Sequence, residues 1–585
     1  MASGAETRRA ASVLVVEGHA GDVSKRLASL ALQMAERQPI VVVPTRNHIQ
    51  SFEKLIARED AHRASGIELM TIYDLELLAI RGDDIQGVRV ALPHEYDLII
   101  EDLKTTGLKP RRVREMVKFF AKGMSQLDDR DQSWFVSDEE RDVFNFMLRC
   151  LRERGLVMQS QLGGMALTAL EQGGGYWDYG KRVIIVDAYT SLDKSSQLFL
   201  EALAPEQLIV GGSSQDCGVL SIAYPDQAGI ARLLDAGAGC EQLAFSAPRA
   251  TVMLGDDPVD EAKRVARKVR EWISTGIDPQ DVVVAAPNGA WISEIGRCLD
   301  SEGVAFDVVG PPLTSKGSHE NEARRSTLAA FAALGLVAYP QGANEWRTWI
   351  GLGDWLALSD AWQSARAMAE TQETSLMSVI ESIAESAEIP DEVGDCQSLL
   401  QKLLEPVRSG MAVIEACQGK VGKALEDALV LRMGENARLL GIGGNEGPVS
   451  AYGRLRRDAY DSAPRCNSPV KLMRFGFERG LIPEALAYSG MMEGFMPGSE
   501  AVDDMTPLNK RERLLAEAEA SFNAIGGMGA SVLAFSCART MDVEEAARSK
   551  AFIERIYVDD HKRKARMAMS RYLQAMIDKG ERSVR

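Results

Sequence analysis

The chain runs Ser12-Val-Leu-Val-Val-Glu17, then an amphipathic stretch from Lys25 to Arg37, then Pro39-Ile-Val-Val-Val-Pro44. The two short valine-rich runs predict buried strands, and the stretch between them predicts a helix because its apolar residues recur at helical spacing. A strand, a helix and a second strand in this order are typical of the βαβ unit of a parallel sheet. The amino-terminal region is therefore expected to be an α/β domain.

Further apolar runs extend this domain. Buried strands are expected at Arg182–Asp187 and Gln207–Gly211, and the intervening residues at about 85–175 are expected to form a helical insertion. The first domain is accordingly expected to span residues 1–250.

A second α/β domain is expected over residues 251–585. An amphipathic helix at Asp260–Ile273 precedes strands at Asp281–Ala286 and Val304–Val309. Residues of about 315–460 are alanine-rich and are expected to form a second helical insertion. Strand character returns near residues 470–475, 484–489 and 531–536. The expected fold class is thus α/β, with two parallel-sheet domains that each carry a helical insertion.

The charge of the chain restricts its expected partners. At 585 residues, with 67 basic and 84 acidic side chains, it has a formal net charge of −17. This charge argues against indiscriminate binding to nucleic acid, because attraction to phosphates needs a positive surface. A local basic channel remains compatible with it, although each candidate cluster is also explained as a solvated helix face. The clusters are Lys109–Arg114, Arg454–Arg457 and His561–Arg566.

Cysteine and histidine positions bear on metal binding and compartment. The eight cysteines are scattered without a CxxC pair, and the six histidines show no ligand spacing such as HExxH. We therefore expect no structural metal and a reducing compartment. No run of about 18 apolar residues occurs, so no membrane span is expected, and a cytoplasmic location is favoured.

The turn after the first strand is a candidate phosphate-binding loop. It reads Gly18-His-Ala-Gly-Asp-Val-Ser-Lys25, between a strand and a helix, where backbone N–H groups and the helix dipole favour anions. The motif GxxxxGK[ST] would need glycine at Val23, lysine at Ser24 and a hydroxyl at Lys25. Gly18, Gly21, Ser24 and Lys25 are candidate nucleotide-binding residues. An eroded nucleotide site and an ordinary strand–helix turn both explain the segment.

The strand Val183-Ile-Ile-Val-Asp187 resembles the Walker B strand of nucleotide hydrolases. Asp187 is a candidate magnesium ligand. Hydrolysis also needs a group that orients or activates water, commonly a second carboxylate after the aspartate, and that position is Ala188.

Several further segments, in order, resemble the motifs of UvrD/RecB-type superfamily 1 helicases. They are Val43–Leu55, Thr71–Leu75, Gly211-Gly-Ser-Ser-Gln215, Asp257–Asp281 and Tyr488-Ser-Gly-Met-Met-Glu-Gly-Phe-Met-Pro497. The order continues through Asn509–Leu515, Ser531–Ser536 and Ser549–Phe552, and is similar to the AddB family of bacterial helicase–nuclease subunits and to its RecC-type relatives. No T-R-A tripeptide supplies an arginine finger, and Arg539 is not assigned that role.

The resemblance implies two RecA-like, P-loop NTPase-like domains with a degenerate ATPase site. It places Gln215 in the nucleotide site, and Thr45, Arg46, His48 and Thr71 against DNA. It further implies a role in double-strand-break repair and recombination beside an AddA-like helicase–nuclease subunit. AddB proteins carry a nuclease domain with four cysteines on an iron–sulfur cluster; no such set occurs in this sequence, so no nuclease activity is expected of it.

Two other functions remain open. A divergent but active ATP-dependent helicase would use Lys25 for the phosphates and Asp187 for magnesium. A non-catalytic protein-interaction scaffold would be consistent with the net charge of −17.

Overall fold

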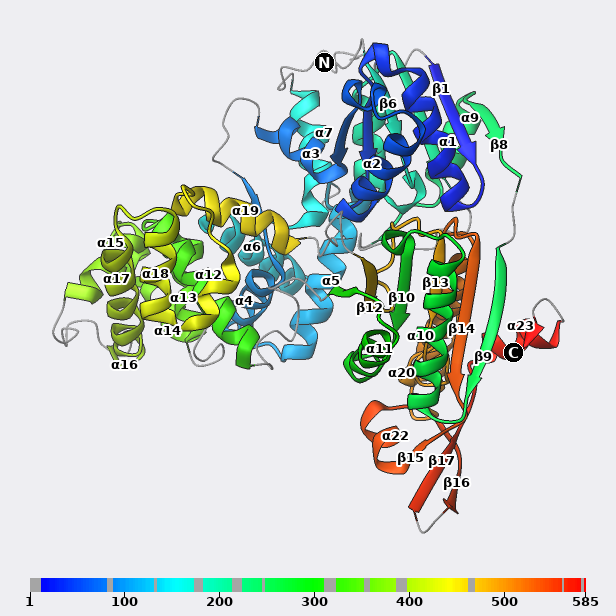
Figure 1. Cartoon of the computed structure of the whole chain (residues 1–585). Coiled ribbons are helices and arrows are strands. Elements are labelled where there is room, and N and C mark those ends of the chain that lie inside the picture. Colours follow the sequence, from blue (N-terminus) through cyan, green and yellow to red (C-terminus); the bar gives the residue numbers. More distant parts are fainter. Residues whose placement is uncertain are drawn as a thin grey trace. The chain divides into compact units, whose positions relative to one another are not determined.

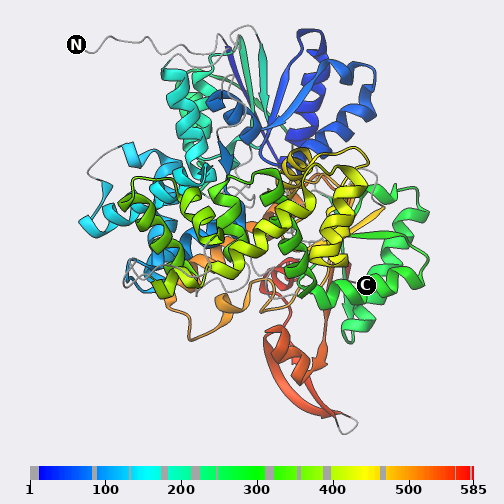
Figure 2. The same cartoon turned by 90° about the vertical axis from the view of Figure 1, so that its left-hand side faces the viewer.

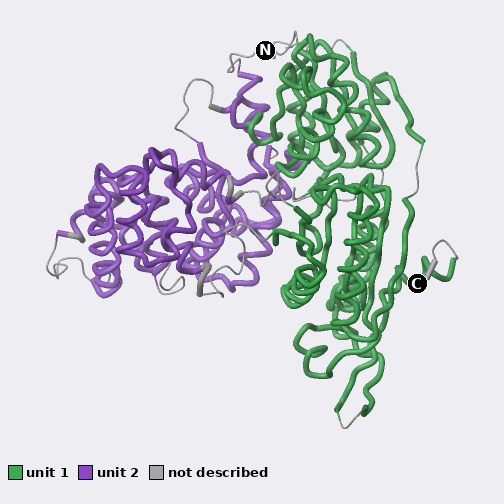
Figure 3. The backbone as a smooth tube through the Cα atoms, in the orientation of Figure 1, with its two compact units in different colours: residues 1–76, 176–310, 462–585 green, residues 77–175, 311–461 purple. Residues whose placement is uncertain are grey.

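The fold was obtained as a computed structural model that contains two compact units (Figures 1 and 2). Unit 1 comprises residues 1–76, 176–310 and 462–585, and unit 2 comprises residues 77–175 and 311–461 (Figure 3). The structure describes residues 12–81, 88–130, 134–172, 182–212, 224–244, 248–309, 322–351, 358–385, 397–460, 469–559, 562–579 and 583–584.

The first lobe of unit 1 is built on a six-stranded sheet of order β3-β2-β6-β7-β1-β8, in which every pairing is parallel. Its strands are β1 (Ser12–Glu17), β2 (Ile40–Val43), β3 (Glu68–Thr71), β6 (Val183–Val186), β7 (Gln207–Gly212) and β8 (Gly239–Gln242). Its helices are α1 (Ala20–Gln33), α2 (Arg46–Asp60), α3 (Ile72–Arg81), α8 (Lys194–Ala202) and α9 (Gly229–Asp235). The four strands expected from apolar runs are confirmed.

One face of this sheet is covered by α1 and α2. Leu27 of α1 and Phe52 of α2 are fully buried against strand residues such as Val41 and Ile185. Because side chains alternate along a strand, this face takes every second residue of β2 and β6. The continuous valine and isoleucine runs reflect burial on both faces, as is usual for parallel sheets.

The second lobe of unit 1 is built on a seven-stranded sheet of order β11-β12-β10-β13-β14-β9-β18, again with parallel pairings throughout. Its strands are β9 (Arg249–Gly255), β10 (Val282–Ala286), β11 (Phe306–Val309), β12 (Val470–Arg474), β13 (Ala485–Tyr488), β14 (Val532–Ala538) and β18 (Ser583–Val584). Its helices are α10 (Pro258–Ser274), α11 (Gly289–Ser301), α20 (Ser499–Val502), α21 (Leu508–Gly526) and α23 (Arg571–Asp578).

A three-stranded antiparallel ribbon follows the end of β14. It has the order β15-β17-β16, with β15 (Thr540–Asp542), β16 (Ile553–Asp559) and β17 (Lys562–Met567), and α22 (Val543–Ser549) connects its first two strands. In both views it extends away from the end of the second sheet (Figures 1 and 2). The basic cluster expected on a helix face at His561–Arg566 lies on β17 instead, from Lys562 onward.

Unit 2 is mainly helical. Its first segment contains α4 (Pro93–Lys104), α5 (Pro110–Gln126), α6 (Asp138–Glu153) and α7 (Leu162–Glu171). Its second segment contains α12 (Glu322–Ala338), α13 (Ala343–Gly351), α14 (Ser359–Thr371), α15 (Leu376–Glu385), α16 (Gln397–Gln401), α17 (Leu404–Cys417), α18 (Gly422–Met433) and α19 (Pro448–Tyr460). The short strands β4 (Arg89–Val90) and β5 (Leu156–Val157) pair in parallel. The expected insertions, at about 85–175 and 315–460, thus fall in one common unit.

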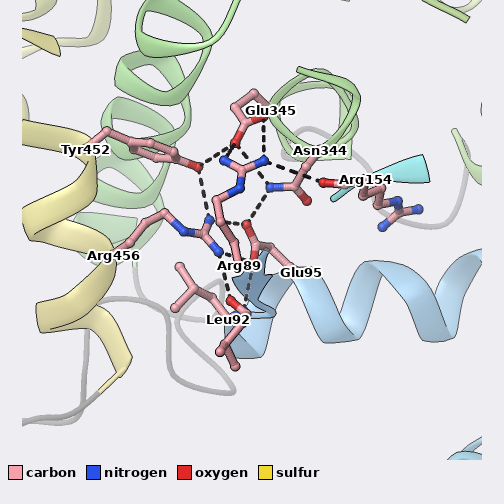
Figure 4. Close-up of polar contacts among 9 residues, drawn as sticks. Arg89, Leu92, Glu95, Arg154, Asn344, Glu345, Tyr452 and Arg456 are labelled. Carbon is pink, nitrogen blue, oxygen red and sulfur yellow. Dashed lines mark hydrogen bonds and ion pairs between the residues drawn. The ribbon is translucent and has the colours of Figure 1, made fainter. Parts of the chain in front are cut away.

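A buried polar network joins the two segments of unit 2 (Figure 4). Glu95 of α4 accepts hydrogen bonds from Arg456 of α19, at 2.9 Å from Nη2, and from Asn344 at 2.6 Å. Arg89 pairs with the fully buried Glu345 at 2.5 Å. Burial alone would raise the pKa of Glu95, but Arg456 lowers it to about 2. The network therefore ties residues near 90 to residues more than two hundred positions later.

Candidate functional site

Two predicted nucleotide-site residues meet at the carboxyl edge of the first sheet. Asp187 follows β6 and Ser24 lies on α1, and the Ser24 hydroxyl is 3.0 Å from Oδ1 and 2.9 Å from Oδ2 of Asp187. Only one strand, β7, separates β6 from β1, so both loops end at the same edge. Burial raises the pKa of Asp187 to about 7, and the hydrogen bond from Ser24 opposes this only in part.

The other predicted phosphate-binding residues lie on a helix and its preceding turn. Gly18 and His19 form the whole connection between β1 and α1, and Gly21, Ser24 and Lys25 lie within α1, which begins at Ala20. A two-residue connection forms no wide loop around a phosphate. The sequence prediction of the strand–turn–helix context agrees with this geometry, but the helix begins five residues earlier than expected.

The amino end of α1 is covered by a glycine-rich turn of the second lobe. The Gly21 N–H donates to the carbonyl of Gly527 at 2.9 Å, and Lys25 Nζ donates to the carbonyl of Gly529 at 3.0 Å. A Cβ on Gly21 would overlap the backbone of Met528 and Gly529. Helix amino ends attract negative charge, and here the Gly527 carbonyl supplies it to the backbone while the Gly529 carbonyl supplies it to the Lys25 ammonium.

A cavity of about 320 Å³ lies beside the Ser24–Asp187 pair, between the two lobes of unit 1. Glu478 and Tyr488 line its far side, and the Tyr488 hydroxyl donates to Glu478 at 2.6 Å. Burial raises the pKa of Glu478, and also lowers the pKa of Arg479. The buried Nε of Arg479 has no hydrogen-bond partner among the described residues. The cavity therefore combines two carboxyl groups of weakened acidity with one guanidinium group.

The four residues predicted to contact DNA occupy the carboxyl ends of β2 and β3. Thr45 and His48 are buried and bond to each other, at 2.9 Å between Oγ1 and Nδ1. Thr71 is buried and donates to Asp74 at 2.8 Å. Arg46 alone among the four is partly exposed. Contact with DNA remains a prediction for these residues, and in this conformation three of them have little free surface.

The first turns of α2 instead dock onto the segment after β12. Asn47 donates to the carbonyls of Phe477 and Arg479, both at 3.1 Å, and Ser51 donates to the carbonyl of Gly480 at 2.8 Å. A Cβ on Gly480 would overlap the ring of His48. Burial lowers the pKa of His48 to about 3, so its ring is neutral at physiological pH.

Acidic and basic groups reinforce this joint between the lobes. Asp281 at the start of β10 is buried and forms ion pairs with Lys54 and Arg58 of α2. Sequence analysis did not find the joint, because the motif segments Val43–Leu55 and Asp257–Asp281 were related to a known family and not to each other. The visible signal was the glycine-rich run Ile525-Gly-Gly-Met-Gly-Ala530, whose small residues allow close backbone approach.

The remaining predicted features are located as follows. Gln215 lies outside the described residues, which reach only Gly212 at the end of β7. Ala188 has a left-handed backbone with φ of 49° and adds no carboxylate beside Asp187. Within the described ranges no group of three or more His, Cys, Asp or Glu side chains is placed to hold a metal ion. None of the described helices is both long and apolar enough to cross a membrane.

The chain matches no protein-family model and no curated protein sequence.

Proposed function

We propose that this chain is a DNA-binding, helicase-like subunit of a double-strand-break repair complex, with RecA-like lobes that no longer hydrolyse ATP. An AddA-like helicase–nuclease partner would supply the catalytic activity. The helicase-like assignment rests on the ordered motifs of the sequence. It is supported by the presence of two parallel sheets, and by the first sheet's Walker-type positions Ser24 and Asp187, which hydrogen-bond to each other.

The proposed loss of ATP hydrolysis is supported by the surroundings of α1 and Asp187. The carbonyl of Gly527 accepts from the Gly21 N–H at the amino end of α1, the carbonyl of Gly529 accepts from Lys25 Nζ, and Asp187 is followed by Ala188. A phosphate group would have to displace both carbonyls, and the position after Asp187, which commonly carries the carboxylate that orients the attacking water, is an alanine. Loss of a single such element commonly lowers the rate by orders of magnitude.

The experiment is fluorescence anisotropy of the full chain with a labelled duplex that carries a single-stranded tail, across a salt series. We expect binding that weakens linearly in the logarithm of salt concentration. ATP hydrolysis is measured in the same samples, with and without DNA, and we expect none above background.

The alternatives predict different results. DNA-stimulated hydrolysis that disappears in Lys25→Ala would establish the divergent helicase and contradict an inactive site. Absence of DNA binding at low salt, with no hydrolysis, would favour the protein-interaction scaffold.

A further inference from the structure

A second concave site lies wholly within the second lobe. It is a groove of about 1150 Å³ between the end of β14, the ribbon strands β16 and β17, and the beginning of α23. This volume exceeds that of sites for single small molecules, which are roughly 300–1000 Å³. The groove lies at the carboxyl end of β14, where parallel sheets commonly bind their ligands. We call it the arginine groove, because four of its lining residues are Arg539, Arg555, Arg566 and Arg571.

Two arginines of the ribbon line this groove, and Lys564 on the same face pairs with Asp559 at 2.9 Å. Arg555 of β16 lies directly opposite Arg566 of β17, and the next pairs on the same face are Tyr557 with Lys564 and Asp559 with Lys562. Like charges that face each other across two strands destabilise a sheet. The pairing of Arg555 with Arg566 therefore has a cost that a bound anion would offset. In a chain of net charge −17, two arginines that face each other are a local exception.

The carboxylates in the groove leave much of this positive charge available. Glu493 is buried and accepts from Arg571 at 2.7 Å, which neutralises that pair. Glu554 and Arg566 approach to 3.3 Å, but both side chains are more than half exposed, so their attraction is weak. Arg555 is exposed and has no ion-pair partner among the described residues.

Arg539, also in the groove, has only a loose counter-ion. Its guanidinium is 3.6 Å from Asp256, and both side chains are well exposed to solvent. An exposed ion pair at this distance contributes little to the free energy of folding, so the guanidinium of Arg539 is available to a ligand.

Aromatic side chains accompany the arginines. Phe552 lines the groove with 45% of its surface exposed, and Tyr557 lines it two residues beyond Arg555 on β16. Phosphate groups need cations, and unpaired bases stack on aromatic rings; a groove with both fits a single strand. The bases of a duplex are stacked inside the helix and are not available to the aromatic rings. An acidic peptide contains no bases that could stack on these rings.

We propose that the arginine groove binds single-stranded DNA, with phosphates on Arg539, Arg555 and Arg566 and bases against Phe552 and Tyr557. This inference rests on the proposed DNA-binding function and names the surface that performs it. It does not depend on the nucleotide site or on the joint between the lobes.

The test compares the full chain with the double variant Arg555→Ala/Arg566→Ala. The probe is a labelled oligothymidylate of about twenty nucleotides, longer than the ~4–16 that a site of this kind covers. The variant should bind about tenfold more weakly, and its log–log salt dependence should be shallower by about 1.4, or ~0.7 for each lost contact. Its melting temperature should equal or exceed that of the wild type, because the cross-strand repulsion is removed.

The matched control is Arg267→Ala/Arg270→Ala on α10 of the same lobe. These arginines are similarly exposed, and the change in net charge is the same. The control should keep the wild-type affinity and salt dependence. An equal loss of affinity in both double variants would show that binding depends on the overall charge of the protein. It would contradict binding of the oligonucleotide in the arginine groove.

The aromatic contribution is tested at a salt concentration high enough to suppress phosphate contacts. Tyr557→Ala should lose about tenfold in affinity with an unchanged salt slope, while Tyr557→Phe should bind as the wild type does. Equal binding by the alanine variant would exclude stacking at this position.

The outcomes separate the two proposals. If the substitutions in the arginine groove leave the affinity for DNA unchanged, the proposal for the groove is wrong. The proposed DNA-binding function is then unaffected. No binding by the wild-type chain at low salt would overturn both. Displacement of the oligonucleotide by polyglutamate at equal charge concentration would assign the groove to acidic peptides.

Discussion

At the residue scale, the burial of Asp187 makes stability depend on pH. The pKa of this carboxyl is about 7 in the folded chain, against its ordinary value of 3.8. The folded state therefore holds the proton more tightly than the unfolded state, and the free energy of unfolding falls as pH rises from about 4 to about 7. Over three units of pKa, this loss amounts to as much as about 4 kcal/mol.

We expect Asp187→Asn to be more stable than the wild type at about pH 8, and the difference to shrink as pH falls to about 5. The neutral amide keeps a partner for Ser24 but removes the cost of a buried negative charge. Urea unfolding at both pH values measures the difference. Asp235→Asn, an exposed change of the same charge on α9, is the control. If the difference in the free energy of unfolding between Asp187→Asn and the wild type does not change with pH, the raised pKa of Asp187 is contradicted.

Single residues also show how far sequence reasoning reached into the site. Asp187 and Ser24 were found because each follows a strand at the place where a nucleotide hydrolase has polar groups. Their direct hydrogen bond was not found, because the motif placed Ser24 at the position of a lysine. Thr45 and His48 were assigned to DNA by resemblance alone, and that resemblance carries no information on whether their side chains are buried.

At the scale of elements, the contact between α1 and the glycine turn holds the two lobes together. Gly21→Ala places a Cβ into the backbone of Gly529, which must move away and break the hydrogen bond from Gly21 to Gly527. We expect a loss of about 1–3 kcal/mol in the free energy of unfolding, the range for overpacking of a tight contact. Faster hydrogen exchange at residues 524–530 should accompany the loss.

The control for this change is Gly453→Ala on α19. A Cβ there meets no atom within 4 Å, and alanine favours the helix by about 0.5–1 kcal/mol over glycine. Gly453→Ala should therefore be neutral or stabilising. Destabilisation of the same size in both variants would show that the loss at Gly21 does not come from the second lobe.

Sequence reasoning identified elements well where both faces are buried. The valine-rich runs predicted β1, β2, β6 and β10 because strands of parallel sheets are apolar on both sides. It missed the ribbon of β15, β16 and β17, in which most residues are exposed or only partly buried. A run of lysines and arginines carries no periodicity that distinguishes such a strand from a solvated helix.

At the scale of the whole molecule, segments that are remote in sequence fold into common units. Unit 2 takes residues 77–175 from one insertion and 311–461 from another. The sequence predicted both as helical, the second from its alanine-rich composition. Their association was not predicted, because it depends on pairings such as Glu95 with Arg456 that leave no local pattern.

This association predicts how unit 2 responds to the loss of one charge. Glu95 is fully buried and Arg456 nearly so, and removing one partner leaves the other charge buried without compensation. We expect Glu95→Gln to lower the free energy of unfolding by about 3–5 kcal/mol, and Glu95→Leu/Arg456→Met to recover much of it, because neither charge then remains. Chemical unfolding followed by tryptophan fluorescence, with Trp346 fully buried in unit 2, measures both changes.

Acid should destabilise unit 2 in the same way without a substitution, because it removes the charge of Glu95. Arg456 holds the pKa of Glu95 at about 2, below its ordinary value of 4.5, so the stabilisation is complete above about pH 4.5 and is lost as pH falls toward 2. Hydrogen exchange near pH 3 should therefore increase in peptides from residues 88–130 and 397–460 of the wild type, with a smaller further increase in Glu95→Gln. An equal response in Glu95→Gln would show that acid acts through other carboxylates, and the network would then not be what couples the two insertions.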